Sequence, residues 1–286
     1  MKKIILLVTL ICFLSTMQIA AQETHSRNMN ELIAFGIWEG FSDSPEDGGT
    51  IEVSRAEFAR LINNMLGFKG MALENPEIPS FLDVNELHKD YNNIMNLRSL
   101  SVINGYNSQL FRPDDSILVN EAVKLLLVAM GYERLAEANG IGYPNGYIQI
   151  AAAKNILPKG LSGNAAVTRD IAALLVSNAI KQPILQKVSF GAAEIMREDK
   201  NATVLTEYLH YYKAEGVLNA IGTTRINKGD ALDFDEMDIG GINYISNLPV
   251  RSMFGKFVTA YYEDDAHDAT KKHIVYIEEK TNRNNV

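Results

Sequence analysis

Apolar residues recur at helical spacing through the first part of the chain. Three stretches place apolar side chains at positions i, i+3, i+4 and i+7, so each predicts a helix with one apolar face. These stripes are Phe58, Leu61, Ile62 and Met65; Val123, Leu126, Leu127 and Met130; and Ala172, Leu175, Val176 and Ala179. A single short helix cannot bury such a face alone, so we expect the three helices to pack on one another as copies of one unit.

Each striped helix follows another predicted helix and a loop. The pairs are expected over 28–40 with a helix beginning at 54, over 91–105 with 119–131, and over 147–158 with 168–180. Ser54 is the predicted N-cap of its helix, and Glu57 three residues later completes a capping box. Gly40, Gly105 and Gly160 are predicted to end the preceding helices with a positive φ angle. This part of the chain is therefore predicted to be an all-α bundle.

The pattern changes after Pro183. Residues 183–207 are expected to be a connector with one short helix near 204–208. Residues 208–280 contain β-rich runs separated by turn-like and acidic loops, which predict a small antiparallel β-sheet or OB-like barrel. Those runs are HYYKAEGVLNAI, DIGGINYI, KFVTAYYE and KHIVYIEE. Residues 281–286 are polar and are expected to form a disordered tail. The predicted fold class is α+β with two domains.

The first residues have the form of a secretory signal peptide. Lys2 and Lys3 precede an apolar run over Ile4–Phe13, and small residues follow. We expect a signal peptide over residues 1–21, with no transmembrane segment after its removal. Cys12 is the only cysteine and lies inside this segment, so the mature protein is expected to fold without disulfides.

The charge and the missing motifs exclude several classes of function. Of the 27 basic residues, Lys2 and Lys3 leave with the signal peptide, so 25 stand against 35 acidic residues. This acidic balance argues against nucleic-acid binding, which needs a basic face. No histidine pair has metal-ligand spacing, and no nucleophile-elbow, zinc-protease or phosphate-loop motif occurs. We therefore expect neither an enzyme nor a cofactor or metal site.

Short motifs recur where the predicted helices end and begin. The first copy has Gly36, Ile37 and Gly40, followed by VSRAE at 53–57. The second copy has Phe81, Asp83 and Val84, followed by Phe111 and Pro113. The third copy has GYPNGYIQIAAA at 142–153, followed by Val167, Thr168 and Arg169. Together they resemble the S-layer homology (SLH) domain, whose signature is a GI-x-x-G helix end, a loop, and a helix that opens with I-T-R-A-E. The resemblance covers residues 28–182, with repeats at about 28–68, 81–131 and 142–182.

The resemblance implies a pseudo-threefold helical bundle that attaches exported proteins non-covalently to a secondary cell-wall polysaccharide, which often carries pyruvate ketals. The sugar would lie in grooves between the copies, against the arginine of the helix-start motif and nearby glycine and backbone groups. The ligand residues expected here are Arg55, Arg169, Trp38, Gly40, Gly105, Gly160, Ser54 and Thr168. In the second copy Val119 and Asn120 occupy the Thr-Arg positions, so that groove is expected to lack its cation.

An arginine at the first position of a helix suits an acidic ligand. Arg55 and Arg169 would stand beside unpaired backbone N–H groups that attract anions, and a guanidinium can grip a carboxylate with two hydrogen bonds. The alternative is that each arginine pairs with a neighbouring acid, such as Asp43 or Glu52 for Arg55, and ties down a loop. Trp38 has the same two options, stacking on a sugar ring or packing half-buried in the protein.

These observations predict an exported cell-surface protein that anchors to secondary cell-wall polysaccharide through SLH repeats. The alternative is a structural or protein-interaction component of the S-layer or cell envelope, with non-binding repeats and other S-layer proteins as partners. An enzyme in the β-rich part is a third option, but no convincing nucleophile or base is found there. Tyrosines in the β-rich runs are expected to fill sheet faces, with a carbohydrate platform as the alternative: Tyr211, Tyr212, Tyr261, Tyr262 and Tyr276.

Overall fold

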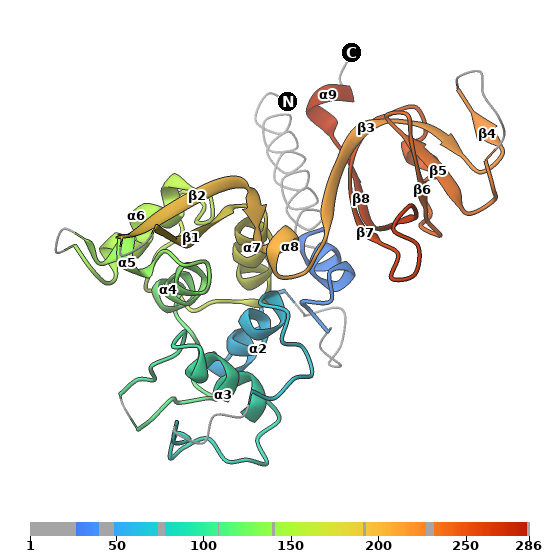
Figure 1. Ribbon diagram of the computed structural model, residues 1–286. Helices are drawn as coiled ribbons and strands as arrows, with labels where there is room; N and C mark the ends of the chain where they lie inside the picture. Colours follow the sequence, from blue (N-terminus) through green and yellow to red (C-terminus); the bar gives the residue numbers. More distant parts are fainter. Residues whose placement is uncertain are drawn as a thin grey trace, which may run out of the picture. The chain divides into compact units, whose positions relative to one another are not determined.

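The computed structural model shows an α+β protein (Figure 1). It describes residues 27–39, 49–73, 78–107, 109–138, 141–190, 193–226 and 232–284. The chain divides into two compact units, Met1–Val204 and Leu205–Val286. The expected signal peptide lies outside the described residues. Within the described ranges, none of the helices combines the length and apolar character needed to cross a bilayer.

The first unit contains the helix pairs that the sequence predicts. Its helices are 27–34, α2 (Arg55–Met65), α3 (Tyr91–Ser99), α4 (Val119–Ala129), α5 (Glu133–Ala136), α6 (Asn145–Ala153) and α7 (Arg169–Ile180). The predicted capping box at the start of α2 is confirmed, because Ser54 Oγ accepts the Glu57 N–H and the Glu57 carboxylate accepts the Ser54 N–H. The first helix of each pair is shorter than predicted.

These first helices end earlier because each closes with a residue in the left-handed conformation. That residue is Gly36 (φ 69°), Ser101 (φ 58°) and Asn155 (φ 55°) in the three copies. The following N–H then reaches back to the last helical turn, from Ile37 to Leu32 O (2.9 Å), from Val102 to Leu97 O (2.8 Å) and from Ile156 to Ala151 O (2.8 Å). This is the Schellman arrangement, in which the freed carbonyls at a helix end are satisfied.

The prediction that Gly105 and Gly160 end these helices is therefore wrong. Both have a positive φ, 83° and 85°, but they lie further along in the loops. Gly40, the third member of that prediction, lies outside the described residues. Sequence reasoning chose the glycines because they adopt positive φ most easily, whereas Ser101 and Asn155 adopt it here with a side chain present.

Three extended segments before α2, α4 and α7 bind one another in a cycle. The Val53 N–H donates to Val167 O (2.8 Å), that of Val167 to Ile117 O (2.8 Å), and that of Ile117 to Val53 O (3.0 Å). Two residues later, the first N–H groups of the helices repeat the cycle, from Arg55 to Asp115 O, from Val119 to Ala165 O and from Arg169 to Ile51 O. The three helix starts thus occupy equivalent positions.

This cycle corrects the alignment of the second copy by one residue. Val119, rather than Asn120, is equivalent to Arg55, and Leu118 takes the place of Ser54. The apolar stripe could not decide how α4 aligns with α2 and α7, because α4 is buried over a wide face and more than one alignment places apolar residues there. Val123, Leu126 and Leu127 on that face are all fully buried. The expected loss of the arginine in the second copy holds in the corrected alignment, since Val119 is also uncharged.

A β-hairpin follows α7 where an irregular connector was expected. Strands β1 (Pro183–Phe190) and β2 (Ala193–Thr203) pair antiparallel. The hairpin is joined to the end of α4, since the Leu185 N–H donates to Met130 O (2.9 Å) and the Tyr132 hydroxyl donates to Pro183 O (2.9 Å). The short helix predicted near 204–208 is present as α8 (Val204–Glu207).

The second unit is built on strands that, apart from the two-residue strand Thr224–Arg225, coincide with the four predicted β-rich runs. They are β3 (Tyr212–Ile221), β4 (Thr224–Arg225), β5 (Glu236–Ile239), β6 (Ile242–Ile245), β7 (Phe257–Asp264) and β8 (Lys272–Glu279), with a 3-10 turn η2 (Arg251–Met253). Their order is β4-β3-β5-β6-β8-β7, and β7 also pairs with β3. The expectation of a wholly antiparallel sheet is wrong at one point, because β6 and β8 are parallel where Ile245 meets His273.

The polar residues after β8 begin as a helix rather than a disordered tail. They form α9 (Thr281–Asn284), whose Arg283 guanidinium lies over the ring of Phe257 at 5.0 Å from its centroid. The Arg283 N–H also donates to Lys280 O (3.0 Å). Composition predicted a tail because five of the residues 281–286 are polar and only Val286 is apolar, but the aromatic contact gives this turn a surface to pack on.

Candidate functional site

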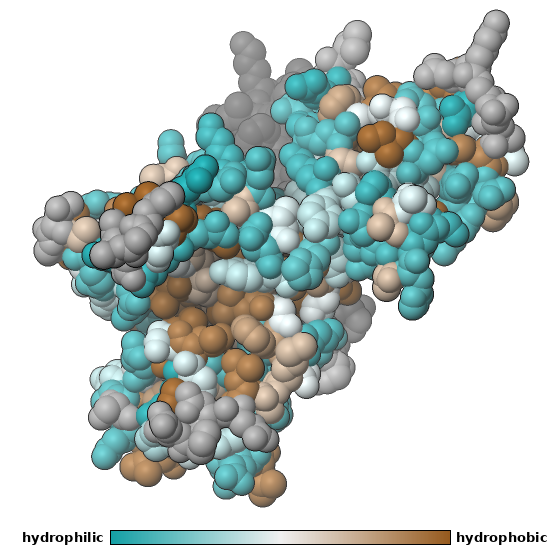
Figure 2. Space-filling view, in the orientation of Figure 1, coloured by the Kyte–Doolittle hydropathy of each residue, from teal (hydrophilic) through white to brown (hydrophobic). Residues whose placement is uncertain are grey.

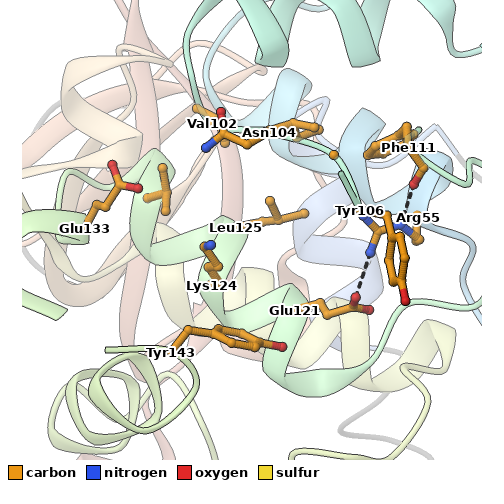
Figure 3. Close-up of a pocket in the computed structure, with 13 residues that line it drawn as sticks. Arg55, Val102, Asn104, Tyr106, Phe111, Glu121, Lys124, Leu125, Glu133 and Tyr143 are labelled. Atoms are coloured by element: carbon orange, nitrogen blue, oxygen red, sulfur yellow. Dashed lines mark hydrogen bonds and ion pairs between the residues drawn. The ribbon is translucent and has the colours of Figure 1, made fainter. Parts of the chain in front are cut away.

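A cavity of about 200 Å³ lies in the first unit between the end of α3 and one side of α4 (Figure 3). Apolar side chains gather over this region of the surface in the space-filling view (Figure 2). The lining residues are Arg55, Val102, Ile103, Asn104, Gly105, Tyr106, Phe111, Glu121, Lys124, Leu125, Val128, Glu133 and Tyr143. Several segments of the unit therefore meet at one pocket with charged, aromatic and apolar walls.

Arg55 forms one end of the pocket and is held by two hydrogen bonds. Its Nε donates to Phe111 O and its Nη1 pairs with Glu121 Oε1, both at 2.8 Å. The guanidinium also lies over the Phe111 ring, 5.0 Å from the centroid. The arginine side chain is 12% exposed. Arg55 thus both lines the cavity and joins α2 to the second copy.

Two roles were considered for Arg55: binding an acidic ligand, or pairing with an acid of the protein. The structure shows the ion pair. Its acidic partner among the described residues is Glu121, and not the sequence neighbour Glu52. Glu52 instead accepts a hydrogen bond from the Ser116 hydroxyl, and Asp43 lies outside the described residues. The sequence could not reveal Glu121 as the partner, because the two residues meet only through the cyclic packing of the copies.

Glu121 uses its two carboxylate oxygens for different purposes. Oε2 accepts the Leu118 N–H (3.0 Å) at the start of α4, and Oε1 receives Arg55. The carboxylate also lies near the positive end of the α4 dipole, where a negative charge is stabilised. One side chain therefore caps α4 and neutralises the arginine that enters from α2.

Lys124 lies one turn further along α4, on the same wall of the pocket (Figure 3). Its Nζ is 5.4 Å from the ring centroid of Tyr143 and 5.8 Å from that of Tyr147. It forms no ion pair or hydrogen bond with another residue in the described part of the chain. Lys124 is partly buried and lines the cavity, so its ammonium is available to a ligand there.

Two tyrosines form the exposed aromatic side of the pocket. Tyr106 is 60% exposed and Tyr143 is 47% exposed. The Arg112 guanidinium stacks on the Tyr106 ring at 3.7 Å from its centroid. Partial burial and the Glu121 carboxylate raise the pKa of Tyr143, while Arg55 offsets part of that rise. Exposed rings of this kind offer a flat apolar surface with a polar edge, which suits a sugar.

The loop after α3 supplies a wall of backbone at Asn104 and Gly105. Gly105 has no room for a side chain, since a Cβ would lie 2.5 Å from Asn107 O and 2.7 Å from Leu110 O. Further along this loop, the Asp83 carboxylate accepts the Phe111 N–H (2.9 Å). The loop is thus fixed against both the pocket and Arg55.

Of the residues predicted as ligands, the structure brings Arg55 and Gly105 together at the pocket. Arg169 is buried and lies outside the pocket, at the start of α7, and Gly160 has open space around it. Trp38 is only 2% exposed, so it packs in the core and presents no face for stacking. Gly40 lies outside the described residues.

Ser54 and Thr168 have capping roles. Ser54 caps α2, and the Thr168 hydroxyl accepts the Ile171 N–H at the start of α7 (3.4 Å). Neither lines the pocket.

Sequence reasoning missed most of the pocket lining, including the charged and aromatic residues Tyr106, Glu121, Lys124 and Tyr143. One signal was available, because Glu121 and Lys124 are the charged residues in the otherwise apolar run of α4. The two tyrosines lie in loops, where periodicity carries no information.

Comparison with known proteins places the pocket loop in a recognised domain. Residues 80–118 match the S-layer homology domain. The chain is 26% identical over 278 residues to the Middle cell wall protein of Brevibacillus brevis, which covers 90% of this chain and 26% of that protein. This chain is thus that of a cell-surface protein, associated with the cell wall and the S-layer.

Two further relatives agree with that location. The Cell surface protein of Thermoanaerobacter kivui is 26% identical over 178 residues, which is 62% of this chain and 22% of that protein. The Surface layer protein of Brevibacillus choshinensis is 25% identical over 186 residues, or 64% and 16%. The chain thus spans about a quarter or less of the length of these relatives. The matched domain includes the Asp83 contact and the pocket wall from Val102 to Phe111.

Proposed function

We propose that the first unit anchors the protein non-covalently to a secondary cell-wall polysaccharide, and that the glycan binds in the pocket beside Arg55. The observation that carries this proposal is the pocket itself. It combines exposed aromatic rings, a backbone wall and a lysine that has no carboxylate partner among the described residues. Carbohydrate sites need such apolar faces together with a few placed polar groups.

The proposal treats the three copies of the first unit as SLH repeats. Its support is the cyclic set of hydrogen bonds among Val53, Ile117 and Val167, together with the domain match over 80–118. The second unit would be an OB-like module in a separate domain. Two strand pairings support this: β7, at one end of the strand order, also pairs with β3, and β6 pairs parallel with β8.

We propose no enzymatic activity for the protein. Among the described residues that line the pocket there is no serine, cysteine or histidine, and the acid Glu121 is already engaged with Arg55. A binding role needs only the positioned rings and charges that are present. Other S-layer proteins are further candidate partners, since relatives carry surface-layer names.

Co-sedimentation with cell-wall sacculi tests the proposed anchoring. The purified protein should pellet with intact sacculi and remain in solution with sacculi stripped of their secondary polysaccharide. Replacing Tyr143 by alanine should reduce pelleting by about tenfold, because a stacking surface worth 1–2 kcal/mol is lost. Tyr212→Ala in the second unit is the matched control, since Tyr212 is 37% exposed and lies outside the pocket.

One observation favours a second candidate function. Arg55, the expected ligand residue, is engaged by Glu121 and Phe111 O, as a purely structural repeat would require. A structural component of the S-layer would pellet equally with intact and stripped sacculi, and Tyr143→Ala would leave pelleting unchanged. Loss of pelleting in Tyr212→Ala alone would instead support a carbohydrate platform on the second unit.

A further inference from the structure

We propose that Lys124, rather than Arg55, receives the anionic group of the glycan, and that the carboxylate of Glu121 balances the charge of Arg55 within the pocket. This inference rests on the proposed function and assigns the residue that gives the same site its selectivity for charge. It departs from the expectation that the arginine at the helix start is the anion receptor.

The bonds of Arg55 leave it poorly suited to that role. Its Nε and Nη1 are already used at 2.8 Å, by Phe111 O and by the Glu121 carboxylate. A ligand carboxylate that approached the remaining guanidinium edge would also approach Glu121, and two like charges at such distances repel each other. Displacing Glu121 would in addition leave the Leu118 N–H at the start of α4 without its acceptor.

The relation between the copies indicates that the arginine and the glutamate act as one structural tie. The third position of α2, α4 and α7 holds Glu57, Glu121 and Ile171. In the cycle, Arg55 of the first copy meets Glu121 of the second, and the equivalent positions of the second and third copies hold Val119 and Ile171. Where the arginine is replaced by an apolar residue, its acidic partner is replaced too.

Lys124 has the opposite properties. It is partly buried, it lines the cavity, and it is the pocket cation that has no carboxylate partner in the described part of the chain. The rings of Tyr143 and Tyr147 lie 5.4 and 5.8 Å from its Nζ, which orients the ammonium without neutralising it. The other charged residues that line the pocket are Arg55, Glu121 and Glu133. Because Arg55 is paired with Glu121, the second positive charge of the lining is that of Lys124.

A pair of probes that differ only in charge tests the assignment. The first is a simple methyl glycoside that carries a pyruvate ketal, and the second is the methyl ester of the same ketal. Calorimetry should show that the protein binds the acid about tenfold more tightly than the ester, the value of one charge-assisted hydrogen bond. Lys124→Met should remove this preference, so that the acid and the ester bind with equal affinity. Lys271→Met, an exposed lysine of the second unit, is the control for net charge.

A double variant separates recognition from a merely structural effect. Glu121→Gln in the Lys124→Met background removes the carboxylate that neutralises Arg55, so preference for the acid should return. The inference is overturned if Lys124→Met keeps the preference of the parent protein, if the double variant does not regain it, or if the parent protein shows none. Sedimentation with intact sacculi reports the proposed function separately, because it needs only that the glycan binds.

Discussion

At the residue scale, the pocket depends on a position where only glycine fits. Gly105 and Gly160 have almost the same backbone conformation, with φ of 83° and 85°. Their surroundings differ, because a Cβ on Gly105 would meet Phe81 Cε1 at 2.6 Å and backbone oxygens nearby, whereas a Cβ on Gly160 would meet nothing within 4 Å. Backbone strain and steric overlap can therefore be measured separately in one protein.

We predict that Gly105→Ala destabilises the first unit more than Gly160→Ala. The second change adds only the left-handed strain of alanine, about 1 kcal/mol. The first adds overlap with Asn107 O and Leu110 O, for a total of roughly 3 kcal/mol. Urea unfolding followed by the fluorescence of Trp38 would measure both. Equal losses would show that the pocket loop moves freely and does not form a fixed wall.

At the scale of elements, the hairpin is held to the first unit by a few polar contacts. The Tyr132 hydroxyl and the Lys154 ammonium both donate to Glu198 Oε2, at 2.9 and 2.7 Å. These bonds lower the pKa of Glu198, with the lysine as the largest cause. Burial and the Glu198 carboxylate raise the pKa of Tyr132. The tyrosine remains a neutral donor, as the geometry requires.

We predict that Tyr132→Phe loosens this hairpin. The variant keeps the buried ring but removes the one hydroxyl proton that Pro183 O and Glu198 Oε2 share, at a cost of about 2 kcal/mol. Amide hydrogen exchange in β1 and β2 should then speed up. Tyr91→Phe, a tyrosine on α3 with a half-buried ring, is the control and should change nothing there. Unchanged exchange in Tyr132→Phe would mean that the backbone contact at Met130 suffices.

A second set of charges joins strands of the other unit. Glu215 on β3 accepts Lys213 (2.6 Å) and Lys280 (2.9 Å), which lower its pKa from 4.5 to about 2. Because the folded pKa is depressed, the stabilisation is complete above about pH 4.5 and is lost as the pH falls towards 2.

We predict that Glu215→Gln reduces the acid sensitivity of the second unit. The parent protein should lose about 1 kcal/mol more than the variant between pH 5 and pH 2, a value kept small because these charges are partly solvated. Hydrogen exchange of the β3 and β7 amides at several pH values would measure it. Glu263→Gln, at an exposed position, is the control. Parallel pH profiles for parent and variant would contradict the assignment.

Much of the element structure could be predicted from local signals. The capping box at Ser54 depends on residues three apart, and the β-rich runs carry their own alternation, so both were found. The hairpin was missed because its strands expose most of their side chains and thus show no apolar pattern. The register of α4 was missed because only backbone bonds between distant segments fix it, as at Val119.

At the scale of the whole molecule, the candidate site arises from the closed cycle of the copies. The sequence predicted Arg55 and Gly105, which belong to recognisable motifs. It could not predict Lys124 or Tyr143 in the same pocket, because they come from different copies and meet only when the cycle closes. The family resemblance supplied a receptor arginine, whereas the packed structure supplies that arginine with an internal counter-ion.

A titration of the isotope-labelled protein with purified wall polysaccharide, followed by NMR, tests the central claim most directly. If the glycan binds in this pocket, the amide signals of Gly105, Lys124 and Tyr143 will shift and saturate, while that of Gly160 in the third copy stays in place. Shifts confined to the Gly160 loop or to the second unit, with none at Gly105 or Lys124, would contradict the account.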